Sequence, residues 1–196
     1  MNAAFPSPRT PDEPMAFTRD EFWRGAMRAW GAFLVLLLTL EVVAAVIGDL
    51  TRPSGSTPFS IMLLLILLVV SLLIGGAISG LSLAIGIPIA HRIASALRHE
   101  PRVPVHLSVF ALYGFGFGAL VGGASYALAF ASTGSTSMGP ALITAFIAGL
   151  IAGVLSAAAV TFAWWTIARD ALRADRGIPR RRLTRTDPDA VVEDSP

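Results

Sequence analysis

The chain has 196 residues, of which 54% are hydrophobic and 14% are charged, whereas ordinary soluble domains carry about 25% charged residues. The apolar residues form four long runs, so they do not describe one large soluble core. The absence of cysteine excludes disulfides, cysteine nucleophiles and thiolate metal sites. All fifteen basic residues are Arg, which we interpret as the codon bias of a GC-rich bacterial genome. We therefore expect a multi-pass protein of the bacterial plasma membrane.

The N-terminal segment has little to bury. Residues 1–18 contain four prolines, which predicts a disordered cytoplasmic tail. Thr18 followed by Glu21 is a capping-box pattern, so a helix is expected to begin near Arg19. The first apolar run, about residues 27–48, is long enough to span a bilayer. A cleavable signal peptide is the alternative, but its apolar region would have about 7–15 residues and lie nearer the N-terminus.

The second apolar run, residues 58–87, is longer than a bilayer requires, which predicts tilt or an extension beyond the membrane. Pro88 follows it and allows a bend. Residues 89–99 can continue as an amphipathic helix in the membrane interface.

Two more runs complete the predicted membrane domain. The third span covers about residues 105–131 and the fourth about residues 141–168. The transmembrane domain is thus expected to comprise residues 19–168. Residues 169–196 form a cytoplasmic tail that is first rich in Arg and then acidic. The predicted fold class is an all-α, integral membrane four-helix bundle with disordered tails.

The distribution of Arg predicts the orientation. Four Arg lie in the N-terminal tail and the first helical turns, three in the central connection and seven in the C-terminal tail. The other two connections together contain only Arg52. Cytoplasmic segments carry the excess of basic residues, so both termini should be cytoplasmic. The helices should then run antiparallel, up and down.

Small residues form a stripe on three of the predicted spans. In the third span, Gly114, Gly118 and Gly122 are spaced by four residues and share one helix face. Such stripes let membrane helices approach closely, either inside one bundle or between protomers, and we leave both interpretations open. The first span has no such stripe, so we expect it at the periphery. The other packing positions that we single out are Ala145 and Gly149 in the fourth span, and Gly75 and Ser79 in the second.

Glu41 is the single ionisable residue well inside a predicted span. A charge at the centre of a bilayer costs about 2.5–3.5 kcal/mol on insertion scales, so the neutral acid is a realistic form. Ser71 and Tyr126 lie at comparable depth and are its candidate hydrogen-bond partners. Glu41 is then either a structural acid bonded to a hydroxyl or a backbone carbonyl, or a proton or cation site.

The sequence predicts no metal site and no cofactor. His91, His99 and His106 fall in or beside the central connection, but their spacings match no metal-ligand motif. No phosphate-binding loop or dinucleotide fingerprint is present.

The basic residues of the C-terminal tail have two interpretations. Arg180, Arg181 and Arg182 can bind anionic lipid head groups, or they can simply determine the orientation of the last span. The tail is short, lacks aromatic residues and ends with four acidic residues, so we expect no binding to nucleic acid.

These patterns predict a membrane protein that is not an enzyme, because no span pairs a base with a nucleophile or holds a set of metal ligands. Its expected partners are the lipid bilayer and either a second copy of itself or an unidentified membrane protein. It would act through helix packing, as an oligomer or as a partner subunit. The alternative is a small transporter or channel-like protein that uses Glu41.

Overall fold

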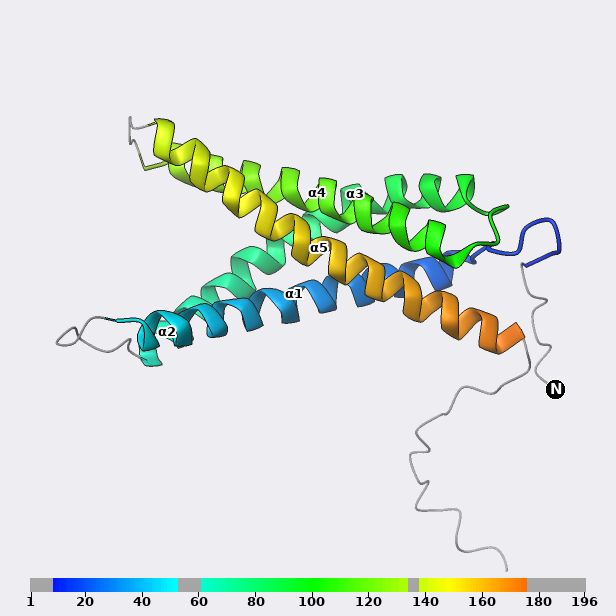
Figure 1. Ribbon diagram of the computed structural model, residues 1–196, viewed down its shortest axis with the longest axis horizontal. Coiled ribbons are helices and arrows are strands. Elements are labelled where there is room, and N and C mark those ends of the chain that lie inside the picture. The colour runs from blue at the N-terminus through cyan, green and yellow to red at the C-terminus, as the bar shows by residue number, and fades with distance from the viewer. Residues whose placement is uncertain (1–8, 53–60, 134–137, 176–196) are drawn as a thin grey trace, which may run out of the picture.

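The computed structural model describes residues 9–52, 61–133 and 138–175, and over these ranges the chain is helical with no strand (Figure 1). Four helices are long and apolar enough to cross a membrane, which confirms the number of spans predicted. The second of them is continuous from Ile61 to Ala96. In chain order the elements are α1 (Arg19–Leu50), α2 (Ile61–Val70), the π-helical turn η1 (Ser71–Gly75), α3 (Gly76–Ala96), α4 (Val103–Ala131) and α5 (Met138–Asp175).

The start of α1 confirms the predicted capping box. The Thr18 hydroxyl accepts a hydrogen bond from the Glu21 backbone N–H at 3.2 Å, and the Glu21 carboxylate accepts one from the Thr18 N–H at 2.9 Å. These two bonds satisfy donors that the first helical turn leaves without a partner. Glu21 also forms an ion pair with Arg9 at 3.0 Å.

The described part of the N-terminal segment is ordered, which corrects the prediction of a disordered tail up to residue 18. Met15 is only 5% exposed, and its backbone N–H donates to the carbonyl of Arg98 at 3.2 Å. Phe17 packs edge-on against Trp164, with 6.2 Å between the ring centroids. The prediction failed because the segment is held by contacts to residues far along the chain, which its own composition does not reveal.

The molecule has a closed end and an open end (Figure 1). At the closed end lie residues 9–18, the α3–α4 connection and the last turns of α5. Toward the open end the helices diverge into two arms, a first arm of α1, α2 and η1 and a second arm of α4 and α5. Among the described residues, neither α1 nor α2 has a Cα atom within 8 Å of one in α4.

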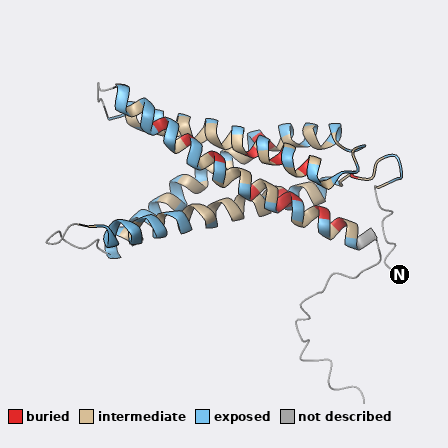
Figure 2. Ribbon diagram, in the orientation of Figure 1, coloured by how far each residue is buried: buried red, intermediate tan, exposed pale blue. Residues whose placement is uncertain are grey.

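The second arm is held together by close contact between the backbones of α4 and α5. A Cβ atom added at Gly118 would lie 2.8 Å from the carbonyl oxygen of Ala152, and one added at Gly149 would lie 2.8 Å from that of Ala119. Gly114 is nearly as crowded, with the carbonyl oxygen of Ser156 in α5 at 3.0 Å from the position of a Cβ. Only glycine fits at such positions, so α4 and α5 meet face to face through their small residues. The buried residues gather along this seam and toward the closed end (Figure 2).

Helix α1 is not peripheral, contrary to the expectation from its lack of a small-residue stripe. It crosses α5 near the closed end, where Arg28 forms an ion pair with Asp170 at 3.1 Å. Ile167 of α5 packs directly over Gly25. One glycine at the crossing point and a polar pair beside it are enough for this contact, so a continuous stripe is not required.

Helix α3 is one continuous helix that passes through Pro88. From the sequence we expected that Pro88 could bend the chain and that residues 89–99 could form a separate interfacial helix. Proline is tolerated inside membrane helices because neighbouring groups satisfy the backbone that it frees. The helix leaves the first arm and passes behind the other helices to reach α4 at the closed end (Figure 1).

Replacing Gly118 with Leu is expected to destabilise the protein, because the new side chain would meet the backbone of α5. Overpacking of this kind costs about 1–3 kcal/mol, and more where backbone must move. The measurement is the thermal unfolding temperature in mild detergent.

Gly116→Leu is the matched control, since Gly116 lies on the same helix, is exposed and has no atom within 4 Å of an added Cβ. Equal unfolding temperatures for the two variants would contradict the assignment of the Gly118 face to internal packing.

Candidate functional site

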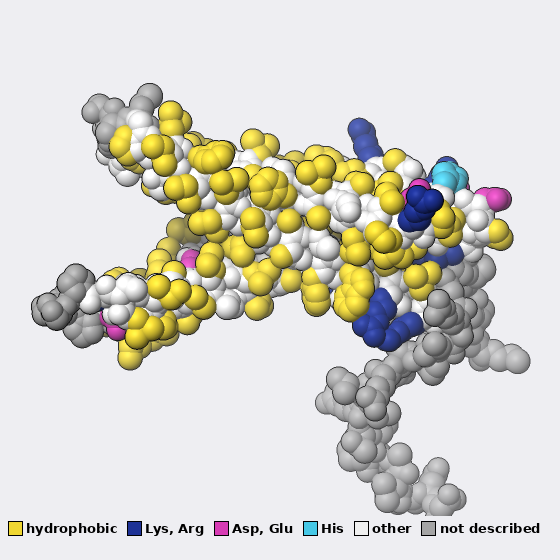
Figure 3. Space-filling model, in the orientation of Figure 1, with side chains coloured by type: hydrophobic (Ala, Val, Ile, Leu, Met, Phe, Trp, Pro, Cys, Tyr) yellow, Lys and Arg dark blue, Asp and Glu magenta, His cyan; other side chains and the backbone are white. Residues whose placement is uncertain are grey.

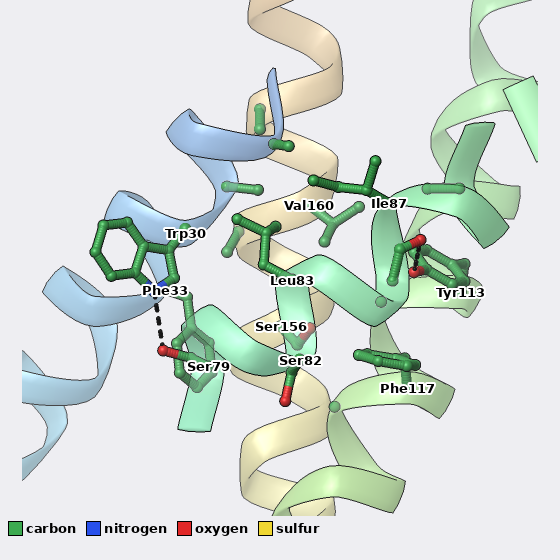
Figure 4. Close-up of a pocket in the computed structure, with 18 of the residues that line it drawn as sticks. Trp30, Phe33, Ser79, Ser82, Leu83, Ile87, Tyr113, Phe117, Ser156 and Val160 are labelled. Carbon is green, nitrogen blue, oxygen red and sulfur yellow. Dashed lines mark hydrogen bonds between the residues drawn. The ribbon is translucent and has the colours of Figure 1, made fainter. Parts of the chain in front are cut away.

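A cavity of about 320 Å³ lies where the four helices meet. Pockets for small ligands usually measure about 300–1,000 Å³ and are mostly apolar with a few polar groups, so this one is at the small end of that range. Aromatic and aliphatic side chains from each of the four helices form most of its wall (Figure 4). Representative lining residues are Phe33 on α1, Leu83 and Ser82 on α3, Phe117 on α4, and Ser156 and Val160 on α5.

Aromatic rings form the wall of the cavity at the closed end. Trp164 is stacked on His106 at 4.8 Å and on Phe110 at 5.8 Å, and Phe17 covers it from the N-terminal segment. Toward the open end the two arms are separated by a deep hollow (Figure 3). The cavity is therefore blocked at one end and continues into the cleft between the arms at the other.

Two hydrogen bonds hold α3 between the arms (Figure 4). The indole N–H of Trp30 donates to the Ser79 hydroxyl at 3.0 Å, and the Tyr113 hydroxyl donates to the carbonyl of Gly86 at 2.9 Å. The first bond joins α3 to α1 and the second joins it to α4. Sequence reasoning missed both, although buried Trp and Tyr usually find a partner for their polar group.

Several hydroxyl groups give the cavity its polar character. Ser82 donates to the carbonyl of Ile78 in its own helix at 2.7 Å. Ser125 and Ser156 also line the cavity, and neither side chain has a hydrogen bond within the described parts of the chain. These two hydroxyls, one on α4 and one on α5, are available to a group that enters the cleft.

Glu41 lies on the face of α1 that packs against η1 and α3. Trp30 contacts Ser79, and about two turns further along α1 Leu37 lies 3.3 Å from the position of a Cβ on Gly75. Residue numbers rise along α1 as they fall along its partner, so Glu41 comes to the level of Ser71. The Oε2 atom of Glu41 is buried, and no hydrogen bond to it exists among the described residues.

The structure separates Tyr126 from this position. Tyr126 belongs to α4, in the second arm, and over the described ranges no Cα atom of α1 lies within 8 Å of one in α4 and no hydrogen bond joins Glu41 to Tyr126. The pairing with Glu41 expected from equal depth is therefore wrong for Tyr126. Depth in a membrane does not reveal that two helices diverge, whereas the register between α1 and η1 brings Ser71 to the right level.

The three histidines do not gather into one site. His106 is 1% exposed, and its Nε2 atom lies 2.9 Å from the carbonyl oxygen of Glu100. The Nδ1 atom of His99 lies 2.9 Å from the carbonyl oxygen of Asp12. Within the described ranges, no group of three His, Cys, Asp or Glu side chains could hold a metal ion. The burial of His106 was not predicted, because its position beside the apolar run resembled that of an interfacial residue.

The basic residues Arg180, Arg181 and Arg182 lie outside the described residues. Of the C-terminal basic residues that are described, Arg169 lies over the ring of Trp165, 5.1 Å from its centroid. This cation–π contact places a charge and an aromatic ring together at the closed end, an arrangement typical of a membrane interface.

Comparison of the chain with protein-family models, with curated proteins and with solved structures finds no match.

Tyr113→Phe is expected to lower the unfolding temperature, because Gly86 loses a hydrogen bond and α3 loses its link to α4. Hydrogen bonds between membrane helices contribute about 0.6 kcal/mol on average and up to about 1.7 kcal/mol. Thermal unfolding in detergent measures the effect.

Tyr126→Phe serves as the control, because the Tyr126 hydroxyl makes no hydrogen bond within the described structure. The role given to Tyr113 would be refuted if both Phe variants unfolded at the temperature of the wild type.

Proposed function

We propose that this chain is a non-enzymatic, multi-pass protein of the bacterial plasma membrane that acts through helix packing. In this proposal the cleft between the arms takes up a transmembrane helix, supplied by a second copy of the chain or by a partner subunit. The observation that carries the proposal is the divergence of the arms, which leaves the Ser125 and Ser156 hydroxyls in the cavity wall without a hydrogen bond among the described residues.

The walls of the cleft suit a helix better than lipid chains. Gly122 and Ala152 pack on each other and Gly75 packs on Leu37, but all three also line the cavity. Small residues of this kind let a further membrane helix approach closely. The free hydroxyls of Ser125 and Ser156 favour an occupant that carries polar groups, because hydrogen bonds between helices stabilise their association. A hydrocarbon chain offers no such groups.

The same proposal includes an antiparallel, up-down arrangement with the closed end in the cytoplasm. Basic side chains are found at the closed end, whereas the arms have an apolar surface (Figure 3). Arg28, Arg98 and Arg169 all belong to the closed end. Cytoplasmic segments carry such an excess of basic residues, and Trp164 and Trp165 then lie at the cytoplasmic interface.

A small transporter or channel-like protein is the second candidate, and the buried, unpaired Oε2 atom of Glu41 favours it. Ionisable residues inside membrane spans often mark ion or proton pathways. Proton and cation flux into proteoliposomes, measured for the wild type and for Glu41→Gln, distinguishes this candidate. Equal, background-level flux in both would exclude it.

Ser125→Leu is expected to abolish association, because the larger side chain narrows the cleft and removes a hydroxyl from its wall. The measurement is the mass and composition of the protein–detergent particle after purification in mild detergent. Association that persists in Ser125→Leu, or a wild type that is purified only as a lone monomer, would refute the helix-binding proposal.

Ala124→Leu is the matched control. Ala124 precedes Ser125 on the same helix at the same depth, is exposed and does not line the cavity. We expect this variant to associate like the wild type. A particle that contains only this chain identifies a homo-oligomer, whereas a second polypeptide lost only in Ser125→Leu identifies a partner subunit.

A further inference from the structure

The carboxyl group of Glu41 has a buried oxygen atom that the described residues leave without a hydrogen bond. This atom, Oε2, lies inside a helix that crosses the membrane. An ionised carboxylate in apolar surroundings is strongly disfavoured unless it is paired, and the usual outcome is that the group becomes neutral. A hydrogen bond that the described structure does not form would therefore have to satisfy this acid.

The surroundings of Glu41 contain no opposite charge. The elements packed against this part of α1 are α2 and η1, and their residues, Ile61–Gly75, include no ionisable side chain. The nearest ionisable groups along the chain are Asp49 at the end of α1 and Arg52 just after it, toward the open end, and Arg28 toward the closed end. The helices α3, α4 and α5 carry their described ionisable side chains, other than Tyr113 and Tyr126, in the turns toward the closed end. These residues are His91, Arg92, His106, Arg169, Asp170 and Arg173.

The helix opposite Glu41 is altered at the corresponding level. Ser71 begins η1, the five-residue π-helical turn in an otherwise α-helical span. In a π-helical turn the backbone hydrogen bonds reach one residue further, and such turns occur frequently at functional sites. The Ser71 hydroxyl makes no hydrogen bond within the described structure. The register thus brings an acid without a partner to the level of a free hydroxyl and a widened backbone turn.

We propose that Glu41 is an intramembrane proton-binding site, with Ser71 and η1 as its hydrogen-bonding environment. In the protonated state the neutral carboxyl group bonds to the Ser71 hydroxyl or to a carbonyl of η1. Binding consists of the addition of one proton to one carboxylate, so it requires no other reactant.

A proton fits this site better than a metal cation does. Hard cations such as Ca²⁺ take about six to eight oxygen ligands, and Mg²⁺ requires near-octahedral coordination. Apart from Ser71, the side chains of α2 and η1 are entirely aliphatic, methionine or glycine. One carboxyl group and one hydroxyl cannot replace the hydration shell of such a cation, whereas a proton needs only the carboxylate. This inference does not depend on the helix-binding function proposed above.

Infrared spectroscopy of the full chain in lipid vesicles tests the proposal. We expect the C=O stretching band of a protonated carboxylic acid in the wild type, and its loss in Glu41→Gln. Ser71→Ala should shift the band to higher wavenumber, because the acid loses a hydrogen bond. Asp49→Asn, at an acid of the same helix whose side chain is 46% exposed, should leave the band unchanged. A missing band in the wild type, or one that survives in Glu41→Gln, would overturn the proposal.

A second measurement on the wild type needs no variant. Dicyclohexylcarbodiimide, an apolar reagent that adds to protonated carboxylic acids, should label Glu41, whereas a water-soluble carbodiimide should label exposed acids and leave Glu41 unmodified. Peptide mapping by mass spectrometry locates the label. If the water-soluble reagent labelled Glu41 as fully as Asp49, or if the apolar reagent did not label Glu41 at any pH, the site would not be an intramembrane proton site.

Discussion

The backbone contact between α4 and α5 is the constraint on which the rest of the structure depends. At Gly118 and Gly149 the two helices approach so closely that a carbonyl oxygen of the partner lies 2.8 Å from the position of a Cβ. Within a bilayer the hydrophobic effect does not draw helices together, so packing of this kind is the main source of their association. The resulting rigid pair leaves its remaining faces to α1 and α3, which reach it only near the closed end.

A few polar contacts determine how the other helices meet this pair. Arg28 and Asp170 join α1 to α5, Trp30 and Ser79 join α1 to α3, and Tyr113 bonds to the backbone of α3. All of these contacts lie at or near the closed end or at mid-depth. Among the described residues nothing comparable joins the arms at the open end, which explains why they diverge and why a cleft forms between them.

The same register that links α1 to α3 also places Glu41. Because Trp30 and Leu37 lie on the face that meets Ser79 and Gly75, the next turn of α1 brings Glu41 to the level of the π-helical turn. A packing arrangement and a chemical site thus share one helix face. Helix binding in the cleft and proton binding at Glu41 are separate proposals.

The sequence by itself determined the four spans, the capping box at Thr18 and the small-residue stripe of α4, because each depends on local composition or on spacing within one helix. The tertiary structure decided which helices and segments contact one another. It ordered residues 9–18 against the closed end, buried His106 beneath Trp164 and made α1 a central helix. It also separated Tyr126 from Glu41 while keeping Ser71 at the level of Glu41. These features arise from contacts between segments far apart in the chain, whose relative angle and register no local pattern specifies.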